Sequence, residues 1–180
     1  NAPGMAITQH QLGMVAQDRG DLEAAEAWYK QALATFEQLK DEPSLASAFH
    51  QLGIVAQKRG DLEAAEAWYK QSLAIDEKLG NAPGMAITQH QLGMVAQERG
   101  DLEAAEAWYK QSLAIREKLG NKPGMAPTYA QLGRLAAARD QLDTAETYLR
   151  KALEIFQARG DTRNVEKVQR NLQRIREKKS

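Results

Sequence analysis

The apolar and polar positions of this chain follow the period of an α-helix. Residues 22–36 place apolar side chains at intervals of three and four, which is the spacing of one helix face, and residues 5–15 do the same. The pattern therefore predicts amphipathic helices. The apolar positions are Leu22, Ala25, Tyr29, Ala32, Leu33 and Phe36 in one segment, and Met5, Leu12 and Val15 in the other.

The whole pattern recurs every 40 residues. The segment RGDLEAAEAWYKQ stands at 19–31, 59–71 and 99–111, and residues 1–17 are identical to residues 81–97. A fourth copy has diverged but keeps QLG in register at 131–133. Self-similarity with a period of this length is typical of repeat architectures. We therefore expect four repeats, 1–40, 41–80, 81–120 and 121–160, followed by a capping helix at 161–180.

Each repeat carries start and stop signals for two helices. It opens with Asn or Asp, whose side-chain oxygen can accept a bond from a free backbone amide, and a proline follows in the first turn. Glycine followed by aspartate, as at Gly20 and Asp21, ends the first helix and caps the second. Asp140 replaces that glycine in the fourth copy. Lys40 stands where later repeats end in glycine, so we expect that corner to be built differently.

A glycine also lies inside the first helix of every repeat. Glycine in a helix interior costs roughly 1 kcal/mol relative to alanine, so a compensating contact is expected at each copy. We expect the paired helix to approach closely at these places, with an alanine opposite each glycine. The glycines are Gly13, Gly53, Gly93 and Gly133, and the expected partners are Ala25, Ala65, Ala105 and Ala145.

A single hairpin of this kind cannot bury both of its apolar faces, whereas stacked hairpins bury one another. The expected fold is all-α, a right-handed α-solenoid of stacked antiparallel helix hairpins with the first helices along its concave wall. The final segment has one apolar side, as a cap requires, formed by Val165, Val168, Leu172 and Ile175. Because no such cap precedes Asn1, the first helix should expose part of its repeat-facing surface.

The motif spacing resembles that of the tetratricopeptide repeat (TPR) family. In the first copy the motif is Leu12-Gly13, then Gly20-Asp21, then Ala25, Tyr29 and Ala32-Leu33. The period is 40 residues where the family usually has 34. The large aromatic residue expected three positions before Leu-Gly is present as Phe49 and Tyr129 but is replaced by Gln9 and Gln89. The long period is similar to that of kinesin light chain, spindle-orientation adaptors and bacterial signalling proteins.

The resemblance implies a peptide- or protein-binding scaffold that uses its concave face. Some members hold a C-terminal carboxylate with Lys and Asn on the first helix, but His10 and Met14 stand at those places, so we do not expect that clamp. Both the histidines and the methionines have a simpler interpretation, as copied repeat residues or as packing residues. The expected peptide-binding residues are His10, Met14, Gln17, His50, Ile54, Gln57, Lys58, His90, Met94, Gln97 and Arg134.

Composition narrows the function further. Lys plus Arg and Asp plus Glu both count 24, so the charge is balanced and gives no general attraction to nucleic acid or membrane. The chain has no cysteine, which fits a reducing compartment, and we expect a cytoplasmic location. Because the chain opens at Asn1 in register with a repeat, we interpret it as an excised or engineered piece of a longer protein.

Other candidate sites have a structural and a functional interpretation. Trp28, Trp68 and Trp108 are expected to pack between copies, or else to form an aromatic ladder on the outer wall. The basic tail at 161–180 is expected to be a solvated cap, with nucleic-acid binding as the alternative. Glu23 and Glu26 recur with the repeat, which is typical of a solvated face.

No catalytic grouping is apparent, so we expect a protein that is not an enzyme and needs no cofactor or metal. The main expectation is a scaffold that binds a protein or peptide ligand. Two alternatives remain, namely a module that self-assembles into a homo-oligomer through its uncapped N-terminal repeat, and the sensor fragment of a larger signalling enzyme.

Overall fold

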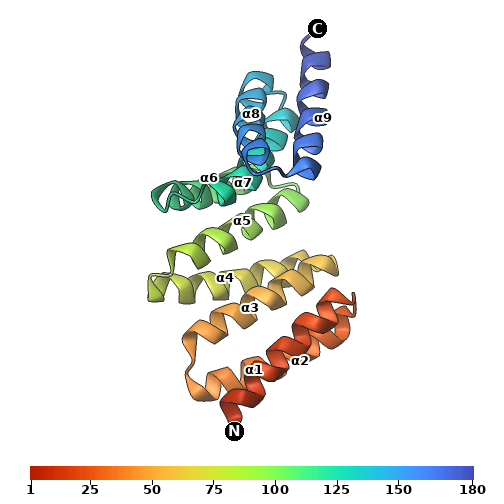
Figure 1. The fold of residues 1–180 in the computed structure, drawn as a ribbon. Helices are drawn as coiled ribbons and strands as arrows, with labels where there is room; N and C mark the ends of the chain where they lie inside the picture. Colours follow the sequence, from red (N-terminus) through yellow and green to blue (C-terminus); the bar gives the residue numbers. More distant parts are fainter.

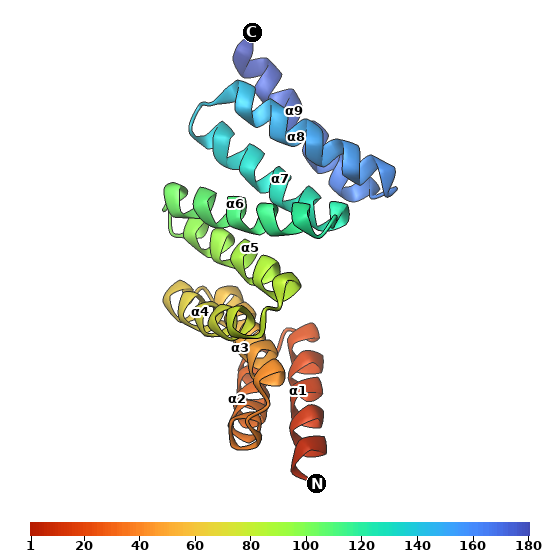
Figure 2. The ribbon, with the colours of Figure 1, turned by 90° about the vertical axis from the view of Figure 1, so that its left-hand side faces the viewer.

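The computed structural model describes all 180 residues and contains nine α-helices and no strand. Figures 1 and 2 both place the two termini at opposite ends of an elongated stack, in which successive helices run back and forth. The predicted all-α solenoid of antiparallel hairpins is confirmed. The helices are α1 (Ala2–Asp18), α2 (Leu22–Leu39), α3 (Glu42–Lys58), α4 (Leu62–Leu79), α5 (Ala82–Glu98), α6 (Leu102–Lys118), α7 (Lys122–Ala138), α8 (Leu142–Ala158) and α9 (Thr162–Lys179).

The predicted cap residues begin most of the helices. The Asp21 carboxylate accepts a bond from the Ala24 amide at 3.0 Å, and Asp61 and Asp101 repeat the contact. Asn81 and Asn121 cap α5 and α7 through the amides of Gly84 and Gly124. Each of these bonds satisfies a backbone donor that has no partner inside the helix.

The corner at Lys40 corrects a prediction. Lys40 adopts the left-handed conformation, with φ of 54°, as Gly80 does with φ of 66°, so this corner is built in the same way as the later ones. Asp140 is also left-handed, with φ of 59°. Both residues carry a Cβ atom in a conformation that glycine adopts without strain.

The glycines inside the first helices closely face the second helix of the same repeat, as expected. A Cβ atom on Gly53 would lie 2.5 Å from the ring of Tyr69, and Gly13 and Gly93 face Tyr29 and Tyr109 in the same way. In the fourth copy Gly133 faces Leu149 and the backbone oxygen of Ala145, one of the expected partners. The sequence analysis missed that the atoms nearest to these glycines belong to a buried tyrosine or leucine side chain.

Neighbouring repeats are joined by contacts between consecutive helices. The second helix of one repeat packs against the first helix of the next, through α2 and α3, α4 and α5, and α6 and α7, and α8 packs in the same way against α9. The apolar clusters extend across these junctions, and Val168, Leu172 and Ile175 of α9 are buried in the last one.

The repeat-facing surface of α1 is more exposed than the same surface of α3. Leu12 and Val15 are 40% and 46% exposed, whereas Leu52 and Val55 at the same places in the next repeat are 1% and 0% exposed. The predicted exposure of the repeat-facing surface of α1 is confirmed. We call the exposed Met5, Leu12 and Val15 the α1 face.

Charged side chains form a second connection between repeats. Glu66 accepts bonds from Lys70 of its own helix at 2.6 Å and from Arg99 of the next repeat, and Glu26 and Glu106 repeat this arrangement. The glutamate at this position is therefore partly buried and paired, which is more than the solvated face that the sequence suggested.

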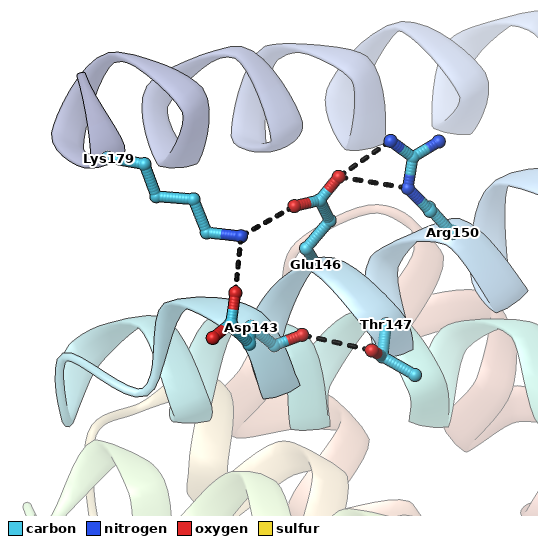
Figure 3. A network of polar contacts seen from close by, with 5 residues as sticks. All are labelled: Asp143, Glu146, Thr147, Arg150 and Lys179. Carbon is cyan, nitrogen blue, oxygen red and sulfur yellow. Dashed lines mark hydrogen bonds and ion pairs between the residues drawn. The ribbon is translucent and has the colours of Figure 1, made fainter.

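The last junction, between α8 and α9, has ion pairs of the same kind. Figure 3 shows Lys179 between Asp143 and Glu146 of α8, with Arg150 at the other oxygen of Glu146. Nζ of Lys179 lies 2.7 Å from an oxygen of each carboxylate. Hydrogen bonds from Lys179 and Arg150 lower the pKa of Glu146 to about 2. The tail thus repeats the polar connection as well as the apolar one.

None of the nine helices combines the length and the apolar character that a passage through a lipid bilayer demands.

Candidate peptide-binding groove

The first helices of the repeats, α1, α3, α5 and α7, line one side of the stack. α9 continues this row beyond α7. Side chains meet there across repeats. Nδ1 of His50 lies 3.2 Å from Oγ1 of Thr88, and Nε2 of Gln57 donates to Oε1 of Glu98 at 2.6 Å. We call this surface the inner groove and define it by positions 10, 14, 17 and 18 of each repeat.

The histidine row is part of the seam between repeats. Nδ1 of His90 lies 3.0 Å from Oγ1 of Thr128, which repeats the contact between His50 and Thr88. His10 makes a longer contact, 3.4 Å from Nε2 to Oγ of Ser47. Each imidazole also lies against the buried tyrosine of its own repeat, with ring centroids 5.2 to 5.4 Å apart. The histidines therefore have a packing role that the sequence alone left open.

This environment keeps two of the histidines uncharged. Burial lowers the pKa of His50 and of His90 to about 4, and the nearby Arg116 contributes to the shift at His90. At neutral pH each ring is neutral, with one nitrogen as donor and the other as acceptor. Nδ1 faces the threonine of the next repeat, and Nε2 has no hydrogen-bond partner within the chain.

The glutamine row supports the tyrosines. Oε1 of Gln57 accepts the hydroxyl of Tyr69 at 3.0 Å, and Gln17 and Gln97 hold Tyr29 and Tyr109 in the same way. These amides thus hold the hydroxyl ends of the tyrosines that the first-helix glycines accommodate. The Nε2 group of Gln57 additionally donates to Glu98 of the next repeat.

The residue at position 14 is apolar in the first three repeats and basic in the fourth. Met14 is 44% exposed, and Ile54 and Met94 are half-buried, so the first three repeats present an apolar strip. The fourth presents the exposed Arg134, and Arg174 of α9 follows 40 residues later. Lys58, at position 18 of the second repeat, is exposed beside this strip.

Two exposed isoleucines stand at position 7 of the first and third repeats. Ile7 and Ile87 are 52% and 49% exposed, so they belong to the surface and not to the core. Ile7 lines a hollow of about 250 Å³ between α1 and α3, together with His10, Met14 and Phe36. The apolar strip is therefore continuous with a recess that could hold a side chain.

A second recess lies at the other end of the groove. It has a volume of about 320 Å³ between α7 and α9, and its wall includes Leu149 and Ile175 as well as three basic residues. The basic residues are Arg134, Arg174 and Lys178. The tail residues thus contribute positive charge to the groove, which the sequence reading as a solvated cap did not anticipate.

One row of positions was missed by the sequence analysis. Phe36, Asp76, Arg116 and Phe156 stand 40 residues apart, and all four are buried, with exposures of 3%, 4%, 6% and 4%. Aligning the copies would have shown that this position changes from aromatic to acidic to basic while its flanking residues stay nearly constant. That change was the available signal, because a core position in a copied repeat should otherwise keep its apolar character.

The tryptophans lie on the second helices α2, α4 and α6 and are half-buried. Trp68 stacks on Phe49 with ring centroids 5.7 Å apart and packs against the apolar clusters on both sides of its repeat. Tyr148 stacks on Tyr129 in the same way at 6.1 Å. In the third repeat Gln89 stands where the second and fourth repeats have Phe49 and Tyr129. Nε2 of Gln89 donates to Oε1 of Gln111 at 3.3 Å, and Oε1 of Gln89 is buried without a partner.

Comparison with known proteins gives one family match. The family model described as the MalT-like TPR region matches residues 5–179, which is nearly the whole chain. No curated protein sequence matches the chain.

Solved structures resemble the fold at low sequence identity. BtubC (BKLC) from P. vanneervenii has a TM-score of 0.76 and 21% identity over 97% of this chain and 81% of that one. The nearly identical TPR-like repeats of a Podosopora anserina putative kinesin light chain give 0.72 and 22% over 99% and 98%. The match to a Pyrococcus horikoshii STAND protein with a TPR sensor gives 0.88 and 17% over 96% of this chain but 27% of that one.

Proposed function

Because the chain belongs to the MalT-like TPR region family, we propose that it is a binding module that holds an extended peptide, or a peptide segment of a partner protein, in the inner groove. The observation that carries this proposal is the strip of Met14, Ile54 and Met94, which is exposed in the first repeat and only half-buried in the next two, whereas the neighbouring Leu52, Val55, Leu92 and Val95 are buried. Methionine surfaces suit peptides because the side chain adapts its shape.

Charge and shape around the strip support the same proposal. The groove is apolar at its start and basic at its end, where Arg134, Arg174 and Lys178 surround a recess. A peptide with apolar residues followed by acidic ones fits this order. We propose a protein or peptide partner and not a nucleic acid, and a module that binds rather than catalyses. The cytoplasmic location expected from the lack of cysteine is part of the proposal.

The groove assignment can be tested with a peptide library displayed on phage. Selected peptides should lose affinity about tenfold or more when Met94 is changed to Asp, because an unpaired carboxylate would replace an apolar contact. Charge reversal by Arg134→Glu should weaken acidic peptides selectively. Affinities are measured by calorimetry, and circular dichroism checks that each variant keeps its helix content.

A matched control lies outside the groove. Ala67 and Ala107 are exposed on second helices, so Ala67→Asp changes the charge by the same amount on another face. If the groove variants bind the selected peptides as tightly as the parent chain and the Ala67 variant, the inner groove is not the binding surface.

A second candidate function rests on the α1 face. Leu12 and Val15 are largely exposed, while their counterparts in the next repeat are covered by a second helix. A second copy of the chain, presenting an equivalent helix, would cover them, and this is the self-assembly alternative. Sedimentation across a concentration series should then show a dimer that the double variant Leu12→Lys, Val15→Lys abolishes. A parent chain that stays monomeric at high concentration contradicts this function.

The sensor alternative draws on a different comparison. The Pyrococcus horikoshii protein carries its TPR region as a sensor within a much longer chain, of which the matched part is 27%. Under this proposal the groove occupant would be the signal that the rest of a larger protein responds to. The peptide selection above identifies the occupant in either case.

A further inference from the structure

At position 36 of the repeat, the second copy has a recess beside Asp76, whereas the third copy has the buried side chain of Arg116. At the junction of α3, α4 and α5 a recess of about 250 Å³ is lined by polar groups. Those that matter below are Ser72, Asp76, Asn81, Gly84 and Thr88. We call this recess the Asp76 pocket.

The next repeat shows what such a pocket accepts. There the buried Arg116 takes the place of Asp76, and its guanidinium donates to the backbone oxygen of Gly124 and, at 3.2 Å, to Oγ1 of Thr128. Its Nη2 group also lies 3.5 Å from the backbone oxygen of Ala86. One arginine therefore fits among two carbonyl oxygens and a threonine hydroxyl.

The same acceptors recur 40 residues earlier. Gly84, Thr88 and Ala46 are the counterparts of Gly124, Thr128 and Ala86, and all three line the Asp76 pocket. The side chain of Asp76 is too short to reach the position of a guanidinium. It instead adds a carboxylate to the wall, so the pocket has acceptors on several sides and lacks a donor at its centre.

The carboxylate itself is incompletely paired. Oδ1 of Asp76 accepts a bond from Nδ2 of Asn81 at 2.7 Å, and Oδ2 has no hydrogen bond within the chain. Oδ2 lies so close to Gly84 that a Cβ atom there would be 2.5 Å away, so the oxygen is held against the helix start. Burial raises the pKa of Asp76, which is the response of a carboxyl group that lacks a counter-charge.

Resting on the proposed function of peptide binding, we propose that the Asp76 pocket binds the guanidinium or ammonium group of an arginine or lysine side chain of the bound peptide. The cation donates to Oδ2 of Asp76, to the carbonyl oxygen of Gly84 and to the hydroxyl of Thr88. Charge-assisted bonds of this kind are the strong class of hydrogen bond, and a planar guanidinium suits several acceptors at once.

The test uses a small probe, Nα-acetyl-arginine amide, with Nα-acetyl-citrulline amide as its neutral counterpart of nearly the same shape. Backbone amide signals of Ser72, Asn81 and Thr88 are followed by NMR during titration. The arginine probe should shift these signals and citrulline should not. Asp76→Asn should weaken the response about tenfold, the effect of one charge-assisted bond.

Two further variants sharpen the result. Glu77→Gln removes the same charge from an exposed neighbouring residue and should leave the titration unchanged. Asp76→Arg copies the Arg116 arrangement and should abolish the response by filling the pocket. Asp76→Asn keeps an oxygen for the bond from Asn81, and its circular dichroism spectrum verifies the fold.

The outcomes separate this proposal from the proposed function. An absent response up to the solubility limit of the probe, an equal response to citrulline, or an unchanged response in Asp76→Asn overturns the pocket assignment. If phage selection still yields groove-binding peptides, without preference for Arg or Lys, peptide binding stands and the pocket assignment fails. If the probe binds but no peptide is selected, the pocket stands and the proposed function fails.

Discussion

Single residues determine how closely the two helices of a repeat approach. In each of the first three repeats, the first helix has a glycine where a buried tyrosine ring needs the space, and the hydroxyl of that ring is held by a glutamine one turn further along. The glycine, the tyrosine and the glutamine thus form one unit, which the first three repeats share. The loss of helix propensity at the glycine is offset by burial of the tyrosine.

Replacing Gly53 with alanine should destabilise the chain by about 1 to 3 kcal/mol, because the added methyl group would overlap the ring of Tyr69. Gly4 offers the same substitution in a helix with no atom within 4 Å, so Gly4→Ala should stabilise by up to about 1 kcal/mol. Urea unfolding monitored by circular dichroism gives both values. Equal effects of the two substitutions would contradict the packing argument.

Burial of His50 and His90 makes the free energy of unfolding depend on pH. The pKa of His50 and of His90 is about 4 in the folded chain and about 6.5 when unfolded, so the unfolded state binds more protons between these values. Stability is therefore fully present above about pH 6.5 and is lost as the pH falls toward 4, by about 1 to 3 kcal/mol for each histidine.

The double variant His50→Gln, His90→Gln should be less stable at pH 7 but should show a flatter pH dependence. The measurement is the urea midpoint at intervals between pH 4 and 7. His10, whose pKa is also lowered by burial but which is more exposed, serves as the single-variant comparison. A parallel decline of parent and double variant would show that other groups cause the acid sensitivity.

At the scale of helices and corners, the sequence predicted most of what the structure shows. Caps, glycine stops and the apolar period follow from local chemistry, so their positions could be read directly. The Lys40 corner could not, because a left-handed lysine is an unfavourable choice that the rest of the repeat imposes. The partner of each glycine could not either, since it depends on the rotation of one helix against the other.

Lys40→Gly should raise stability by about 1 kcal/mol, because glycine adopts the left-handed conformation without the Cβ penalty. Ala34→Gly is the opposite case, since Ala34 is exposed in the interior of α2 and glycine there should cost about 1 kcal/mol. Thermal unfolding of the two variants should therefore shift in opposite directions. A Lys40 variant that is less stable than the parent would mean that its side chain has a role at the corner.

At the scale of the whole molecule, the stacking order was predictable and the groove was predictable only in part. The period placed histidines, glutamines and methionines in rows, but it did not show that the histidines contact the next repeat or that the glutamines hold the tyrosines of their own repeat. Asp76 and Arg116 were hidden among core positions, where a 40-residue alignment reveals them but a helical wheel does not. Side-chain partners across a junction depend on the exact stacking geometry, which no local pattern encodes.

Residues 1–17 and 81–97 have the same sequence, so the chain contains an internal control for the effect of a neighbouring repeat on a helix. α1 and α5 differ only at their last residue, Asp18 against Glu98, yet Leu12 is 40% exposed and Leu92 is 1% exposed. Their intrinsic helix propensities therefore nearly cancel, and the main differences are the neighbouring helix and the partner residues Phe36 and Arg116. A difference in their amide-exchange protection would therefore report the nearest-neighbour coupling free energy of the array, together with end fraying, without any mutation.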